Sequence, residues 1–214
     1  MTRVEPEVAT TDAGRLARPA RRQQLLSAAL EVFVETGYHA SSMGDVADRA
    51  GVSKPVLYQH FEGKLELYLA LLDEQLAEMA STVRTALAST DSNRERVEAV
   101  TSAFFEFVDR RDGAYRLVFE SDLIGDERVR ERLARTTDLC AAPIADVIET
   151  ATGLSIAEAT LLGAALVGQA QVSARAWLTA GRPIPRADAA RLVATLSWRG
   201  VRGFPAHGHV GASG

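Results

Sequence analysis

Residues 42–61 read Ser-Met-Gly-Asp-Val-Ala-Asp-Arg-Ala-Gly-Val-Ser-Lys-Pro-Val-Leu-Tyr-Gln-His-Phe, and this stretch decides the fold. Ser42 is followed three residues later by Asp45, which is the capping-box pattern found at the start of a helix. The helix that follows should end at Gly51, because glycine readily adopts the left-handed conformation that closes a helix. The first part of the stretch therefore predicts a helix of about two turns over 43–50.

A second short helix is expected a few residues later. Ser53 is a good N-cap and Pro55 is tolerated in a first helical turn, which predicts a helix over 54–60. Two short helices joined by a tight turn form a helix-turn-helix, whose second helix lies in the major groove of DNA. The apolar positions that can hold the two helices together are Val46, Ala47, Ala50, Val52, Leu57 and Phe61. The remaining side chains of the second helix should face outward, where DNA would cover them: Lys54, Pro55, Val56, Tyr58, Gln59 and His60.

Apolar residues outside this motif also recur at helical spacing. Leu26, Ala29 and Phe33 share one face of a helix that Gly37 should end. Turn residues separate the later helices, which are predicted at 64–88, 94–111, 114–123, 126–151, 155–180 and 185–202. No segment shows a convincing alternation of apolar and polar residues of the kind that predicts a β-strand. The predicted fold is all-α, with a three-helix helix-turn-helix head, a larger helical domain and about nine helices in total.

Length and composition are those of an ordinary globular protein. The chain has 214 residues, 47% of them hydrophobic and 24% charged, so it can bury enough apolar surface to fold. Its longest apolar stretch, 161–168, is far shorter than the ~20 residues of a membrane-spanning helix. Residues 1–18 lack the apolar core of a secretory signal, and a single cysteine, Cys140, excludes an internal disulfide framework. We therefore expect a cytoplasmic protein with no membrane partner.

Charge is distributed unevenly along the chain, whose net charge is −4. Residues 15–64 carry seven basic against five acidic side chains, a balance of +2, and both lysines of the protein, Lys54 and Lys64, fall in this segment. Residues 65–214 carry sixteen arginines against twenty acids, a balance of −4. A modestly basic segment thus contains the motif, and an acidic remainder follows it.

Residues 21–72 resemble the DNA-binding domain of the TetR family of bacterial transcriptional regulators. The resemblance is carried by Leu26, Ala29, Phe33, Gly37 and Tyr38, by Met43, Val46, Ala47, Ala50, Gly51 and Val52, and by Ser53-Lys54, Leu57-Tyr58-Gln59-His60-Phe61 and Lys64. It implies a DNA-binding domain over 18–79 with its motif at 42–61, and a helical ligand-binding and dimerisation domain over 80–203. Flexible tails are expected at 1–17 and 204–214.

The resemblance also implies DNA-contacting residues. Ser42 and Met43 would contact phosphate or the groove edge, and Lys64 would hold a phosphate at the start of the following helix. The recognition helix would contribute Lys54, Pro55, Val56, Tyr58, Gln59 and His60. Gln59 suits a bidentate pair with adenine, whereas lysines supply charge without sequence preference. Two alternatives stay open: Tyr58 and His60 can pack against neighbouring helices, and Ser42 serves as a helix cap with or without DNA.

A homodimer is expected because one recognition helix reads too few base pairs, whereas two copies about 34–36 Å apart read a pseudo-palindrome. The helices at 155–180 and 185–202 offer close-packing surfaces, and the predicted interface residues are Gly163, Leu166, Ala170, Leu192 and Leu196. The alternative is that these faces are buried within one chain.

The middle helices are rich in aromatic residues, and the family places an effector in a cavity of this domain. The candidate ligand-binding residues are Phe104, Phe107, Tyr115, Phe119, Cys140 and Trp177. Aromatic residues at helical spacing are also typical of plain core, so both interpretations remain open.

The sequence lacks the usual signatures of an enzyme. No Gly-rich phosphate loop, His-Glu-x-x-His metal motif or nucleophile elbow is present, and neither a cofactor nor a metal site is predicted. His207 and His209 in the predicted C-terminal tail lack further ligands. We expect a ligand-responsive repressor that binds operator DNA as a homodimer and is released by a small-molecule effector. The alternative is a helical ligand sensor with no operator of its own.

Overall fold

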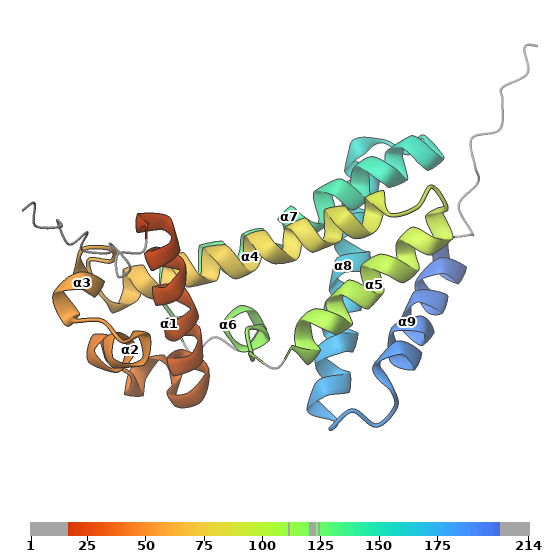
Figure 1. Cartoon of the computed structure of the whole chain (residues 1–214). Helices are drawn as coiled ribbons and strands as arrows, with labels where there is room; N and C mark the ends of the chain where they lie inside the picture. Colours follow the sequence, from red (N-terminus) through yellow and green to blue (C-terminus); the bar gives the residue numbers. More distant parts are fainter. Residues whose placement is uncertain (1–16, 111, 120–122, 124, 202–214) are drawn as a thin grey trace, which may run out of the picture.

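The computed structural model describes residues 17–110, 112–119, 123 and 125–201, and these residues form nine α-helices without a strand (Figure 1). The helices are α1 (Arg18–Ala40), α2 (Met43–Ala50), α3 (Lys54–Tyr58), α4 (Lys64–Ala88), α5 (Asn93–Asp109), α6 (Tyr115–Phe119), α7 (Glu127–Thr152), α8 (Ile156–Thr179) and α9 (Arg186–Val201). The all-α prediction is confirmed. Apart from residue 17, the two predicted tails lie outside the described residues, and so do His207 and His209.

Helices α1, α2 and α3 form a small head with its own core. Leu25 of α1, Val46 of α2 and Leu57 of α3 are fully buried, so each helix contributes to the same apolar centre. Gly37 interrupts α1 as predicted, with φ 77° and ψ 162°, but one more helical turn follows it as far as Ala40. Glycine suits this break because its left-handed φ strains other residues.

Helix α4 connects the head to the rest of the molecule (Figure 1). Its first half packs in the head through buried Leu67 and Leu72, and its second half packs in the C-terminal bundle through buried Met79 and Val83. The helix therefore runs without a break past the boundary predicted after residue 79, which remains a prediction.

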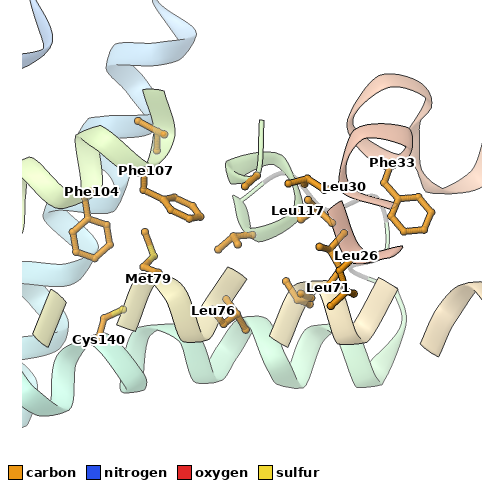
Figure 2. Packing of buried hydrophobic residues seen from close by; sticks show 14 of the residues in the cluster. Leu26, Leu30, Phe33, Leu71, Leu76, Met79, Phe104, Phe107, Leu117 and Cys140 are labelled. Carbon is orange, nitrogen blue, oxygen red and sulfur yellow. The ribbon is translucent and has the colours of Figure 1, made fainter. Parts of the chain in front are cut away.

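The C-terminal bundle consists of the second half of α4 with α5, α7, α8 and α9. Two of its helices approach closely at Gly163 of α8, where an added Cβ would lie 2.7 Å from the carbonyl oxygen of Ala141 in α7. Figure 2 shows the apolar packing on the head side of this bundle, where Phe104, Met79 and Cys140 meet. Small residues on α8 thus pack inside the chain.

A turn and the short helix α6 join the bundle to the head. Gly113, at φ +69°, lies so close to α1 that an added Cβ would be 2.7 Å from Cγ1 of Val34. Arg116 of α6 donates from Nη1 to the carbonyl oxygen of Val34 at 3.0 Å. Figure 2 shows Leu117 of α6 close to Leu30 of α1. The predicted helix over 114–123 is shorter here, because only 115–119 are helical among its described residues.

A search of the described helices for a membrane span found none that is both long and apolar enough. The same residues contain no cluster of three or more His, Cys, Asp or Glu side chains placed to hold a metal.

Candidate nucleic-acid interface and internal cavity

The helix-turn-helix is built by two local devices that the sequence predicted. Ser42 and Asp45 form a full capping box, in which the Ser42 amide donates to Oδ2 of Asp45 at 2.8 Å and the Asp45 amide donates to Oγ of Ser42 at 3.2 Å. The Asp45 carboxylate also accepts from the Ser42 hydroxyl at 2.8 Å, and this hydrogen bond, followed by the one from the Ser42 amide, lowers the pKa of the Asp45 carboxyl. Gly51 ends α2 in the left-handed conformation, with φ 65°. Together they set the angle at which α3 leaves α2.

Helix α3 presents its polar side chains to solvent. Leu57 anchors the helix because it is completely buried, whereas Tyr58 is 50% exposed although it is a large aromatic residue. The other exposed residues of this segment are Lys54, Pro55 and Gln59, and Val56 and His60 are half-buried. An exposed tyrosine on a short helix is consistent with a surface that a partner covers.

Lys54 lies across the start of α2. Its Cε is 3.0 Å from the position that a Cβ at Gly44 would occupy, so this glycine leaves room for the lysine side chain. The charges of Lys54 and Lys64 both contribute to the lowered pKa of Asp45. The N-terminal turn of α2 is therefore bordered by two cations beside exposed Ser42.

Met43 does not lie where the sequence placed it. Its side chain is only 7% exposed and belongs to the core of the head, so it is not available to contact a DNA groove. Met43 faces inward because it lies on the same side of α2 as the buried residues Val46 and Ala50. The predicted DNA contact by Met43 is corrected accordingly.

Lys64 has structural partners that sequence reasoning missed. Its Nζ donates to the carbonyl oxygens of Tyr38 at 2.7 Å and Ser41 at 2.8 Å, and lies 4.2 Å from the centre of the Tyr38 ring. The ammonium thus satisfies carbonyl groups at the end of α1 and orients the segment before α2. An ammonium has three hydrogens, so two carbonyl partners leave one for a phosphate, and that contact remains a prediction.

A cavity of about 200 Å³ lies in the C-terminal bundle, among α4, α5, α7, α8 and α9. Its wall is mostly aliphatic, with Val97, Val100, Val147, Ile144, Ile148 and Leu166 among its residues. The hydroxyl groups in the wall already have partners. Thr101 donates to the Val97 carbonyl at 2.7 Å, Thr152 to the Ile148 carbonyl at 2.7 Å, and Ser197 to Oε1 of Gln169 at 2.9 Å. The cavity therefore suits an apolar occupant.

Arg96 is the charged residue among those that line the cavity. Its Nε donates to the Leu87 carbonyl at 3.0 Å, and Nη1 donates to Oδ1 of Asn93 at 2.8 Å. Its ion pair with Asp91 is long, at 3.6 Å, and the Asp91 side chain is fully exposed. This pair is weak and easily exchanged, because solvent screens exposed charges.

None of the six predicted ligand-binding residues lines this cavity. Phe104, Phe107, Cys140 and Trp177 are buried in the core, and Tyr115 and Phe119 are half-buried against it. The Phe107 and Phe119 rings pack edge to face with centres 5.9 Å apart, and the Trp177 ring nitrogen donates to the Ile184 carbonyl at 2.8 Å. Burial raises the pKa of the Cys140 thiol to about 11. These side chains hold the bundle together. The cavity wall is mostly aliphatic, with Trp198 as its aromatic residue, and sequence alone does not separate such a pattern from core.

An apolar surface runs along α8 and α9. Leu161 and Val172 of α8 are 71% and 68% exposed, and Leu192 and Leu196 of α9 are 67% and 65% exposed. We call these four residues the α8–α9 face. Outside 156–196, the large apolar residues that are exposed in the described chain are Tyr58 and Leu139, and both are less exposed than these four.

Only part of the predicted dimer interface lies on the α8–α9 face. Leu192 and Leu196 are there, but Gly163 and Ala170 are buried and Leu166 is half-buried. Gly163 contacts α7 and Ala170 lines the cavity, so these two residues are corrected to the interior of the chain. Leu166 also lines the cavity but is half-buried, and its place at the interface stays a prediction. The small residues allow α7 and α8 to approach closely, as the alternative interpretation of the sequence held.

A family model and two relatives match this chain, and all three describe bacterial transcriptional regulators. A family model described as bacterial regulatory proteins, tetR family, matches residues 25–71. The chain is 44% identical to the HTH-type transcriptional activator FasR of Mycolicibacterium smegmatis over 191 residues, which are 89% of this chain and 87% of FasR. It is 34% identical to the HTH-type transcriptional repressor KstR2 of Mycobacterium tuberculosis (strain ATCC 25618 / H37Rv) over 90 residues, 42% of this chain and 45% of KstR2.

Solved structures share the fold. A TetR-like transcriptional regulator from Rhodococcus sp. RHA1 matches with a TM-score of 0.66 and 28% identity, covering 88% of this chain and all of that one. The regulator FadR of Bacillus subtilis, solved in complex with stearoyl-CoA, matches with a TM-score of 0.65 and 20% identity, covering 82% of this chain and 96% of FadR.

Proposed function

The chain belongs to the TetR family and is a DNA-binding transcriptional regulator rather than an enzyme; from this premise we propose that it binds a pseudo-palindromic operator as a homodimer. We further propose that a small molecule with an apolar chain enters the cavity of the C-terminal bundle and changes the affinity for that operator. The observation that carries the proposal is the aliphatic cavity behind a helix-turn-helix whose α3 exposes its polar side chains and Tyr58 to solvent.

The operator would be read by α3 and held by the residues around it. Gln59 has the donor and acceptor pair that recognises adenine, and Val56 and Pro55 can meet a thymine methyl group. Ser42, Lys54, Tyr58, His60 and Lys64 would contact phosphates or the groove edge. A single head covers too few base pairs, so the two-fold partner supplies the second half-site.

The partner copy would dock on the α8–α9 face. Four large apolar side chains more than 60% exposed on two adjacent helices are costly in water, and burying them against their symmetry mates would remove that cost. Two helices from each copy make a four-helix interface of the kind expected for a two-fold dimer.

The effector is proposed to be an amphipathic anion with an acyl chain. The mostly aliphatic wall suits the chain, and Arg96, one of the lining residues, can exchange weakly held Asp91 for a carboxylate or phosphate of the head group. The structural neighbour FadR, solved with stearoyl-CoA, supports this chemical class. Binding shifts the equilibrium between two conformations only if one of them holds the ligand more tightly. The prediction of repression remains a prediction, because FasR is named an activator and KstR2 a repressor.

The test measures DNA binding with and without stearoyl-CoA. DNase footprinting on the DNA beside the chain's own gene should give one protected palindrome, and stearoyl-CoA should change the affinity for it at least tenfold. Val97→Phe fills the cavity and should abolish that response while leaving operator binding unchanged. Leu133→Phe, at a half-buried position that does not line the cavity, is the matched control.

Two outcomes count against the proposal. A regulator that protects no sequence in the footprint, or in selection from random duplexes, would be the helical sensor without an operator. If wild type and Val97→Phe responded equally to stearoyl-CoA, the effector would bind outside the cavity.

A further inference from the structure

A groove of about 380 Å³ lies between α4 and α7, and we call it the α4–α7 groove. The two helices pack against each other, and Figure 1 shows α7 alongside α4. No residue that lines this groove also lines the cavity inside the bundle, so the two are separate. The volume is within the ~300–1,000 Å³ of common small-molecule sites.

The floor of the groove is apolar. Leu76 and Ala80 of α4 line it and are only 4% and 3% exposed, so they lie at its bottom. Leu139 of α7 also lines it and is 47% exposed. An exposed leucine beside buried apolar residues leaves an apolar strip in contact with water, which an apolar ligand group could cover.

The lining residues carry three arginines and one carboxylate, a formal balance of +2. Nε of Arg132 donates to Oδ1 of Asp73 at 2.8 Å, so these two charges offset each other. Arg84 and Arg135 are exposed, and neither forms an ion pair with a carboxylate of the described residues. The two helices therefore each contribute one uncompensated positive charge to the groove.

Arg84 acts across the boundary between the two helices. Burial raises the pKa of Cys140 in α7, and the positive charge of Arg84 opposes that rise. A charge on α4 that is felt by a buried thiol of α7 lies close to α7. The groove thus brings an apolar floor and two cationic side chains from different helices together.

We propose that the α4–α7 groove binds a small amphipathic anion, with its carboxylate or phosphate held by Arg84 and Arg135 and its apolar chain on Leu76 and Leu139. Guanidinium groups match the oxygens of both anions with paired hydrogen bonds. A polyanion without apolar groups would leave the floor in contact with water, so the floor favours an amphipathic ligand. The site is additional to the cavity of the proposed function and does not depend on it.

Binding at this site would join α4 to α7, because the anion takes one arginine from each helix. Helix α4 enters the head, so the ligand would stabilise the packing of the helix that connects the two parts of the chain. A ligand that binds only the folded chain should also raise its unfolding temperature, and the rise should increase with ligand concentration.

The first experiment measures decanoate binding by isothermal titration calorimetry in Val97→Phe, whose internal cavity is filled. Decanoate should still bind at one site per chain. Adding Arg84→Ala/Arg135→Ala to this protein should weaken binding at least tenfold. Adding Arg94→Ala/Arg130→Ala instead removes two exposed arginines that do not line the groove, and this control should keep the affinity.

The second experiment varies the probe in Val97→Phe. Decyl phosphate carries the same chain with a phosphate, and its affinity relative to decanoate shows which anion the arginines prefer. Acetate has a carboxylate without the chain, and decyltrimethylammonium has the chain with a positive charge. Both should bind at least tenfold more weakly than decanoate, because each lacks one of the two features that the groove recognises.

Three outcomes would overturn the proposal. One is a Val97→Phe protein that binds neither decanoate nor decyl phosphate, since the groove is intact there. The others are equal decanoate affinity with and without Arg84→Ala/Arg135→Ala, and equal affinity for decanoate and decyltrimethylammonium. The proposed function fails on different results, because it is tested by operator binding and its response to stearoyl-CoA.

Discussion

Two exposed surfaces in the described part of the chain have opposite chemistry. The surface around α3 and the start of α1 is polar and positively charged. Arg18 and Arg22 form no ion pair with a carboxylate of the described residues, and Gln59 is exposed. The α8–α9 face is apolar, with Leu161, Val172, Leu192 and Leu196 each more than 60% exposed. A polyanion suits the first surface and a second copy of the same apolar face suits the second.

The two surfaces also differ in how the chain supports them. The α3 surface stands on a short-range framework, in which the Ser42 capping box and Gly51 set α2 and the buried Leu57 anchors α3. The α8–α9 face stands on long-range packing, because both α8 and α9 pack on α5. The first surface therefore depends on a few adjacent residues, whereas the second depends on α5, which lies far from α8 and α9 in the sequence.

The largest effect should come from placing charge on the apolar face. Leu192→Asp/Leu196→Asp should give a folded monomer, because both side chains are exposed in the single chain and only the dimer buries them. Operator affinity should fall at least a hundredfold, since two linked heads bind 10²–10⁴-fold more tightly than one. Sedimentation velocity and anisotropy measure both quantities.

Leu139→Asp is the control for this change, because Leu139 is also an exposed leucine but lies on α7. It should remain dimeric with wild-type affinity. A Leu192→Asp/Leu196→Asp protein that stays dimeric would place the interface elsewhere and remove the contrast between the two surfaces.

Smaller changes should destabilise the support of the apolar face without touching its surface. In Gly163→Ala the new Cβ would lie 2.7 Å from a backbone oxygen of α7, so the two helices must move apart. We expect a loss of about 1–3 kcal/mol in the free energy of unfolding, more than the 0.5–1 kcal/mol that alanine gains in a helix. Gly125→Ala meets nothing within 4 Å and should change stability by less than about 0.5 kcal/mol in chemical denaturation. If the two variants were equally stable, Gly163 would not lie in close contact with α7.

The same distinction explains what the sequence could predict. The helix-turn-helix was predictable to within two residues because Ser42, Asp45 and Gly51 act on their near neighbours. The cavity was not, because Val97 and Ile148 look like core in any local pattern and only the packing of distant helices leaves space beside them. The burial of the Met43 side chain was not predictable for a related reason. Its place at the start of a helix is local, but the side that is buried depends on the rest of the head.

On the polar surface, Gln59→Ala should act on sequence preference. Gln59 is exposed just after α3. The variant should lose about 1–3 kcal/mol of discrimination at one base position in each half-site and little elsewhere. Selection from randomised operators measures this directly. An unchanged base preference would leave Gln59 as a solvent-exposed residue with no reading role.

The smallest effect that we expect on this surface is that of replacing Lys64. The replacement distinguishes a structural role of the ammonium from a role in DNA binding. Lys64→Ala removes the hydrogen bonds to the carbonyls of Tyr38 and Ser41, which should cost about 1 kcal/mol in unfolding free energy because these groups can turn to water. If the ammonium also meets a phosphate, the salt slope of DNA binding should fall by about 0.9 per subunit, for every sequence alike. Lys64→Arg keeps the charge and should restore the slope more fully than the stability, because the planar guanidinium does not match two carbonyls placed for an ammonium. A slope unchanged in Lys64→Ala, with stability reduced, would assign the lysine to the framework beneath the polar surface.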